Sequence, residues 1–174
     1  TPHAFGRGDT MTLDAVIERV AELGPDMVEI TGGEPLLQPE CLPLMKRLAD
    51  EGRTVLLETS GGLSIAGVDP RVHVILDVKT PDSAEVSCNL DSNYAILKGS
   101  DEVKYVVCSA DDTIWSIRHV REHRLHERCQ VVFSPAFDDF SPAEAARLIL
   151  ESRLPIKLQL QLHKEVWGPA VRGV

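Results

Sequence analysis

The stretch MVEITGGEPLLQ at residues 27–38 decides the fold class of this chain. Its apolar start predicts a short strand over 27–31, directly before two glycines and a carboxylate. Helical spacing of apolar residues predicts a helix over 12–23 before this strand, with Thr12 as its N-cap. A second helix is expected after the strand, with Pro39 in its first turn. This order of helix, strand and helix indicates an α/β protein.

The alternation of strands and helices continues to the end of the chain. Near-continuous apolar runs predict further strands over 55–57, 72–78, 103–107, 131–133 and 156–162. Amphipathic spacing predicts helices over about 112–126 and 142–152, and a short helical piece near 93–98. Apolar strands that alternate with amphipathic helices are typical of a parallel sheet covered by helices.

Length and composition predict one soluble domain over residues 1–174. Hydrophobic residues make up 43% of the chain, and no apolar run reaches the roughly 20 residues that span a bilayer. The net charge of −9 argues against tight, non-specific binding to duplex DNA. The four cysteines form no CxxC pair, which argues against a cysteine metal site in this stretch and against a disulfide scaffold. We therefore expect reduced thiols in a cytoplasmic protein.

Polar and small residues stand at the end of every predicted strand. In parallel α/β folds, ligand sites gather at the carboxyl ends of the strands, so these residues form the candidate site. They are Thr31–Pro35, Glu58–Gly61, Asp77–Lys79, Val107–Ser109, Phe133–Pro135 and Gln161–Lys164.

Each of these segments has a functional and a structural interpretation. The glycines of Thr31–Pro35 allow backbone to approach a ligand, and Glu34 is able to accept from a cationic amine, but a tight turn explains the same residues. The segment Glu58–Gly61 suits a ribose or an amino acid, or an ordinary capped turn. Asp77 and Lys79 share one strand face, where they form either a salt bridge or a polar ligand pocket.

Other sequence features carry no site. The chain has no P-loop lysine motif, no GxSxG, no HExxH and no GxGxxG. His119, His123 and His126 have helical spacing, but the surrounding arginines oppose cation binding. We interpret this face of the helix as solvated.

Taken together, the strand ends resemble the radical S-adenosylmethionine (SAM) superfamily and, within it, the 7-carboxy-7-deazaguanine synthase family. The motifs that carry the resemblance are TGGEPLLQ at 31–38, ETSG at 58–61, DVK at 77–79, KYVV at 104–107, VVFSP at 131–135 and QLHKEVWG at 161–168. The resemblance covers nearly the whole chain. It implies a partial, open (β/α) barrel that lacks the first strand and the cluster loop. The cluster cysteines of the family, CxxxCxxC, are expected upstream of Thr1 in a longer gene product.

The resemblance also implies an activity and its cofactors. The family converts 6-carboxy-5,6,7,8-tetrahydropterin into 7-carboxy-7-deazaguanine, with loss of ammonia, in queuosine biosynthesis. SAM, a 4Fe–4S cluster and Mg²⁺ are its cofactors, so the chain is expected to be a radical SAM carbon–nitrogen lyase. A homodimer and a flavodoxin-like or ferredoxin-like electron donor are the implied partners. No nucleic acid and no membrane are expected.

Site residues follow from the same resemblance, position by position. The SAM-binding residues would be Gly32, Gly33, Glu34, Glu58, Thr59, Ser60, Asp77, Val78, Lys79, Ser134, Pro135, Ala136 and Phe137. Thr31, His163 and the free carboxylate of Val174 would bind the pterin, and Thr1 would bind Mg²⁺. No side chain is assigned as catalytic, because the cofactor carries the radical chemistry.

The tail has its own prediction. The strand over 156–162 would deliver His163 to the ligand-bearing edge, and Gly168-Pro169 would fold the rest of the tail over the opening. The alternative is a tail that docks for stability, with Trp167 burying apolar area.

Two other functions stay open at this point. The first is a radical SAM activating enzyme, which takes hydrogen from a partner protein. The second is a ligand-binding domain that has lost the cluster.

Overall fold

The computed structural model describes residues 9–168, apart from the side chain of His163. It contains one six-stranded sheet in the order β1-β2-β3-β4-β5-β6, and all neighbouring strands are parallel. The strands are β1 (Met27–Ile30), β2 (Thr54–Thr59), β3 (His73–Val78), β4 (Glu102–Val107), β5 (Gln130–Pro135) and β6 (Ile156–Leu158). Within the described residues β1 and β6 do not pair, so the sheet stays open. The predicted partial, open (β/α) barrel is confirmed.

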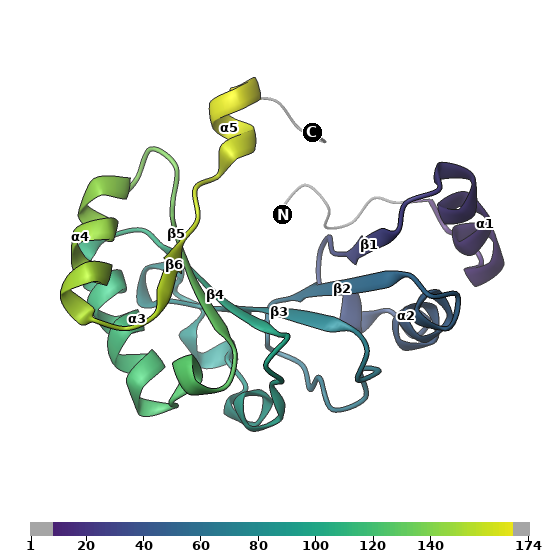
Figure 1. The fold of residues 1–174 in the computed structure, drawn as a ribbon, viewed down its shortest axis with the longest axis horizontal. Coiled ribbons are helices and arrows are strands. Elements are labelled where there is room, and N and C mark those ends of the chain that lie inside the picture. The colour runs from purple at the N-terminus through teal and green to yellow at the C-terminus, as the bar shows by residue number, and fades with distance from the viewer. Residues whose placement is uncertain (1–8, 169–174) are drawn as a thin grey trace.

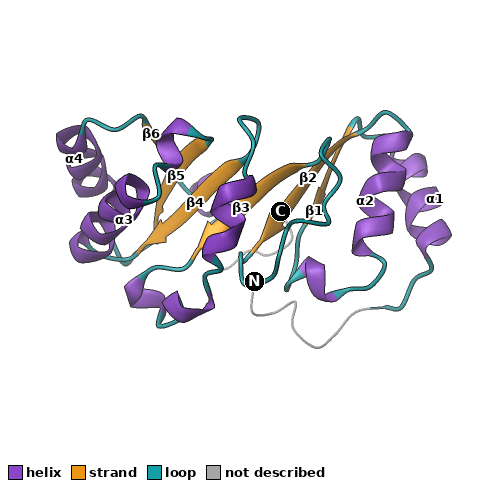
Figure 2. Ribbon diagram, turned by 90° about the horizontal axis from the view of Figure 1, so that it is seen from below, coloured by secondary structure: helices purple, strands orange, loops and turns teal. Residues whose placement is uncertain are grey.

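Helices cover one face of this sheet. The covering helices are α1 (Leu13–Leu23), α2 (Cys41–Asp50), α3 (Ala110–Glu122) and α4 (Pro142–Ser152). A further short helix, α5 (Leu162–Trp167), follows the last strand. In Figure 1, α1 and α2 lie beside β1 and β2, whereas α3 and α4 lie at the β5–β6 end. Between β3 and β4 the chain forms the short turns η3 (Pro81–Ser83), η4 (Val86–Cys88) and η5 (Asp91–Ile96) instead of a long helix. Figure 2 shows short helical turns over the middle of the sheet.

Helix α1 begins and ends at local signals, whereas α2 does not start where its sequence predicted. The Thr12 hydroxyl accepts a hydrogen bond from the Ala15 N–H at 3.2 Å, and Gly24 ends α1 with φ of 71°. The predicted start of α2 is wrong, because Pro39 precedes the helix and Glu40 is its N-cap. Pro43 stands in the first turn instead, where a missing N–H costs no intrahelical hydrogen bond.

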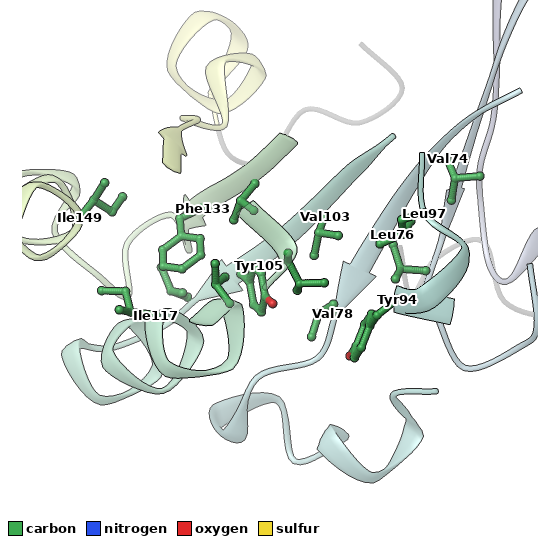
Figure 3. Packing of buried hydrophobic residues seen from close by; sticks show 14 of the residues in the cluster. Val74, Leu76, Val78, Tyr94, Leu97, Val103, Tyr105, Ile117, Phe133 and Ile149 are labelled. Carbon is green, nitrogen blue, oxygen red and sulfur yellow. The ribbon is translucent and has the colours of Figure 1, made fainter. Parts of the chain in front are cut away.

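Alternate residues of the central strands point to opposite faces of the sheet. In β2, β3 and β4 every second side chain is buried under the helices, and the intervening ones are mostly half-buried on the other face, called here the open face. The larger core cluster joins β3, β4 and β5 to α3, α4 and η5, with Tyr105 and Phe133 fully buried within it (Figure 3). A smaller cluster joins α1 and α2 to β2 around Met45 and Leu48.

The predicted strand over 156–162 is wrong in its second half. Strand β6 ends at Leu158, and residues 162–167 form α5. The last bond of the ladder runs from the Gln159 N–H to the Phe133 carbonyl at 2.9 Å. Two residues further along β5, Pro135 points its nitrogen to the same side and has no N–H to donate. The ladder ends there, so the helix α5, rather than a strand, carries His163.

The predicted solvated histidine face is also wrong. His119 is only 8% exposed, and its Nδ1 lies 2.8 Å from the hydroxyl of Tyr105. The imidazole stacks on Trp115, with ring centroids 4.9 Å apart. Burial, together with nearby His123, lowers the pKa of His119 to about 4. The physical reason is that Tyr105 is fully buried and its hydroxyl needs a hydrogen-bond partner.

Candidate active site

The predicted segments that follow or end β1, β2 and β3 lie at the carboxyl edge of the parallel sheet. Residues 31–34 follow β1, Glu58 and Thr59 end β2 and Ser60 follows, and Asp77 and Val78 end β3. The register pairs Ile30 with Leu57, which places Thr31 opposite Glu58 at the next position. The Thr31 hydroxyl donates to Glu58 Oε2 at 2.9 Å. The first two predicted segments are therefore in direct contact.

Glu34 ties these two segments together a second time. Its carboxylate accepts from the Ser60 N–H at 2.9 Å, from the Ser60 hydroxyl at 2.5 Å and from the Thr59 hydroxyl at 2.8 Å. The Leu36 N–H donates to it at 3.1 Å. Burial raises the pKa of Glu34, but these hydrogen bonds outweigh burial and lower it. An ionised Glu34 holds the 58–60 segment in place, and a ligand amine would compete with bonds that already exist.

An ion pair crosses the open face beside this contact. Lys104 of β4 donates from Nζ to Glu58 Oε1 at 2.8 Å, and both side chains are about a quarter to a third exposed. Burial raises the pKa of Glu58, yet Lys104 and the Thr31 hydroxyl outweigh it and lower that pKa. Burial lowers the pKa of Lys104, and Glu58 more than reverses that effect. Both groups are therefore charged at neutral pH.

The third segment forms its own ion pair. Lys79 Nζ lies 2.7 Å from Asp77 Oδ2, in agreement with the predicted placement of these residues on one face. Asn89 binds the Lys79 backbone at both its N–H and its carbonyl, each at 2.9 Å. Asp77 also stands opposite Lys104 in the β3–β4 register. The charged side chains of β2, β3 and β4 thus form one continuous group.

The predicted SAM-binding segment 134–137 lies apart, at the end of β5 and directly after it. Pro135, Ala136 and Phe137 line a cavity of about 340 Å³ between this strand end and the chain before and within α5. Asp138, Asp139 and Glu165 also line it. The ammonium of Lys164 lies 5.2 Å from the centroid of the Phe137 ring. This cavity is lined by two phenylalanines, Phe137 and Phe140, by other apolar side chains and by carboxylates.

Several predicted residues do not point to the open face. Thr59 and Val78 belong to the buried face of their strands, and Pro135 is buried as well. Their contribution to a ligand site would come from backbone. Thr1 and Val174 lie outside the described residues, and for His163 only the backbone is described, within α5.

Sequence reasoning missed Lys104. Lys104 belongs to the KYVV motif of the family resemblance, but the resemblance gives it no site role. A signal was present, because a lysine alternates with the buried Val103 and Tyr105 and must therefore face away from the helices.

No group of three or more His, Cys, Asp or Glu side chains in the described residues is arranged to hold a metal ion. Cys41, Cys88, Cys108 and Cys129 are all free thiols. No helix within residues 9–168 has the length and apolar character needed to cross a membrane.

The chain is similar to known proteins both in sequence and in fold. The 7-carboxy-7-deazaguanine synthase of Chlorobaculum tepidum is 40% identical over 177 residues, which cover 100% of this chain and 80% of that protein. The crystal structure of QueE from Escherichia coli superimposes with a TM-score of 0.60 at 22% identity, over 87% of this chain and 64% of that chain. Streptococcus suis SuiB bound to S-adenosylmethionine gives a TM-score of 0.57 at 13% identity, over 91% of this chain and 44% of that one. No protein-family model matches the chain.

Proposed function

This chain belongs to the 7-carboxy-7-deazaguanine synthase family, and on that premise we propose that it is a radical SAM carbon–nitrogen lyase. It converts 6-carboxy-5,6,7,8-tetrahydropterin into 7-carboxy-7-deazaguanine with loss of ammonia, in the biosynthesis of 7-deazapurines such as queuosine. The observation that carries the proposal is the direct bonding of Thr31 to Glu58 and of Glu34 to Ser60 at the carboxyl edge. These bonds build one polar site from segments of two different strands.

The described residues fit SAM in two places. The turn at Gly32 has φ of 130°, and no heavy atom lies within 4 Å of the position a Cβ would take, so a ligand is able to approach the backbone there. The cavity beside Phe137 has the size expected for a nucleoside, near the lower end of ligand pockets of about 300–1,000 Å³. We assign the amino-acid end of SAM to the segments 32–34 and 58–60. The adenosine then occupies the cavity at the end of β5, with Asp77 and Lys79 between the two.

The cluster and SAM, when bound, supply the one-electron chemistry that removes a hydrogen atom from the substrate. A four-iron cluster needs thiolate ligands, and no fitting group of side chains occurs in the described residues. The cluster cysteines are therefore proposed to lie upstream of Thr1. The residues of this chain bind and orient SAM and substrate and keep water away from the reacting atoms.

The pterin is assigned to the open face next to Thr31. The guanidine-like edge of a pterin presents N–H donors, which suit hydroxyl and carboxylate oxygens. His163 and the terminal carboxylate of Val174 complete this assignment. Helix α5 brings the His163 backbone near the edge of the sheet where the cavity lies.

Magnesium is proposed to bind at Thr1, because a hard cation with oxygen ligands suits a carboxylated substrate. Withdrawal of Mg²⁺ and the substitution Thr1→Val should each lower turnover by the complete, cluster-loaded enzyme. Equal turnover in the presence of a chelator would contradict this assignment.

We extend the proposal to a homodimer that is reduced by a flavodoxin-like or ferredoxin-like donor. Sedimentation tests the dimer, and donor-dependent turnover tests the electron donor.

The experiment that tests the function uses the complete protein with its cluster reconstituted under anaerobic conditions. With SAM, a reductant and the carboxytetrahydropterin, mass spectrometry should detect 7-carboxy-7-deazaguanine, and ammonia should be released. SAM cleavage without pterin turnover, together with a radical on a co-purifying protein, would instead indicate an activating enzyme. Failure of the complete protein to bind any cluster would indicate a ligand-binding domain.

A further inference from the structure

Three side chains form a continuous chain of hydrogen bonds across the open face. The Thr31 hydroxyl donates to one oxygen of Glu58 at 2.9 Å, and Lys104 donates to the other oxygen at 2.8 Å. The three residues come from the end of β1, from β2 and from β4, so the chain passes over β3 (the order of these strands is visible in Figure 1). Residues 31 and 104 have no direct contact of this kind, and Glu58 joins them.

The hydrogen bond to Glu58 leaves the Thr31 hydroxyl able to act only as an acceptor towards a further partner. A threonine hydroxyl has one proton and two acceptor lone pairs. Since its proton is donated to Glu58, the hydroxyl oxygen can only accept from a further partner. Thr31 is exposed, so that acceptor faces the space above the sheet.

Lys104 keeps Glu58 in the state that this arrangement requires. Three carboxylates lie near Glu58 in the sheet: Glu29 of β1 is opposite Leu56, Asp77 of β3 is two residues beyond Ile75, the partner of Glu58, and Glu102 of β4 is opposite Ile75. Burial and, to a smaller extent, repulsion from Glu58 raise the pKa of Glu29. Without Lys104, Glu58 loses both the hydrogen bond that fixes its carboxylate and the positive charge that lowers its pKa. A carboxyl that turns away or takes up a proton no longer holds the Thr31 proton.

We propose that Lys104 is a positioning residue for the pterin: through Glu58 it makes the Thr31 hydroxyl an obligatory acceptor for an N–H of the substrate. The inference rests on the proposed function, since that function places a pterin beside Thr31. It adds a determinant of specificity. A ligand that offers an N–H at this position is bound, and one that offers a lone pair is rejected because two acceptors then face each other.

The test measures binding of 6-carboxypterin, a stable oxidised analogue with the same pyrimidine edge, to the complete protein by isothermal titration calorimetry. Lys104→Met and Thr31→Val should each weaken binding about tenfold, the worth of one hydrogen bond in a desolvated site. The double variant should bind about as weakly as either single one, because both remove the same interaction. Lys46→Met is the matched control, since Lys46 forms an exposed pair with Asp50 on α2 and should leave binding unchanged.

Glu58→Gln provides a variant of nearly the same size. Lys104 has only protons to donate, so it orients the amide oxygen towards itself and the amide nitrogen towards Thr31. Thr31 would then accept from the amide, and its own proton would point outward. Binding of 6-carboxypterin should fall at least as far as in Thr31→Val, while the melting temperature stays close to that of the unmodified protein. A structural role alone would not produce this split.

Two results would overturn the inference. One is additive loss of binding in the Lys104→Met, Thr31→Val double variant, which would mean that the residues act separately. The other is unchanged pterin binding by Lys104→Met or Glu58→Gln proteins that remain folded. The proposed function fails separately, when the unmodified enzyme neither binds 6-carboxypterin nor converts the tetrahydropterin.

Discussion

Ser60 binds Glu34 twice, through its backbone N–H at 2.9 Å and through its hydroxyl at 2.5 Å, both to the same carboxylate oxygen. These two residues follow adjacent parallel strands, β1 and β2, and their bonds hold the two turns together. Thr59 and Leu36 occupy the other oxygen of Glu34. The turn that is proposed to bind the amino-acid end of SAM is therefore shaped by a carboxylate whose acceptor positions are already in use.

Replacement of Glu34 by Gln should loosen this junction. The amide has one acceptor oxygen in place of two, so at least one pair of donors loses its partner, at a cost of about 1–3 kcal/mol. We expect faster hydrogen exchange at the Ser60 amide and at least tenfold weaker SAM binding to the cluster-loaded complete protein. Glu40→Gln is the control, because Glu40 is exposed and its side chain does not cap α2. Unchanged exchange at Ser60 in the Glu34 variant would show that the junction does not depend on this carboxylate.

Gly32 should tolerate no other residue without a loss of stability. Its φ of 130° is a conformation that side-chain-bearing residues rarely adopt, although the space around it is open. Gly32→Ala should therefore cost about 1–3 kcal/mol through backbone strain and not through a clash. Gly99→Ala is the matched control, since Gly99 has an ordinary φ and only an ordinary contact at 3.9 Å. Equal melting temperatures for the two variants would contradict the strain argument.

The stability of the protein should depend on pH through His119. Its pKa is about 4 in the folded protein, against 6.5 for an unperturbed histidine, so the unfolded chain binds more protons between these values. Neutral His119 makes its full contribution to the free energy of unfolding above pH 6.5. This contribution, about 3 kcal/mol at most, is lost as the pH falls towards 4. Besides His123, Asp91 faces the imidazole and acts in the opposite direction.

Urea unfolding at pH values from 7 to 4 measures this contribution as a difference between proteins. His119→Gln keeps a partner for Tyr105 but does not titrate, so its free energy of unfolding should fall less steeply than that of the unmodified protein. Parallel pH profiles for the two proteins would show that His119 does not titrate with a lowered pKa.

The tail gives a prediction that rests on sequence. Deletion of Gly173 and Val174, or extension of the chain past Val174, should weaken pterin binding by about one to two decades, because a charge-assisted hydrogen bond is worth about 1.5–3 kcal/mol. SAM cleavage and the melting temperature should stay nearly the same. A lower melting temperature with normal pterin affinity would show instead that the tail is structural.

The sequence by itself determined the order of the elements and the edge of the sheet where the candidate site residues gather. Helix caps, glycine turns and runs of apolar residues depend on neighbours within a few positions, so Thr12, Gly24 and the strand at Met27 were predictable. Because carboxyl ends of parallel strands meet at one edge, the segments around Glu34 and Glu58 were expected to be close.

Only the tertiary structure decided which side chains meet and where elements end. The bond between Glu58 and Lys104 joins residues 46 positions apart across an intervening strand, and it depends on sheet register. His119 is buried because Tyr105, on another element, needs a partner for its hydroxyl. Strand β6 is short because Pro135 of its neighbour cannot donate the next hydrogen bond. Each of these outcomes depends on a contact with a residue distant in sequence. The sequence pattern around one residue does not reveal which distant residue it will contact.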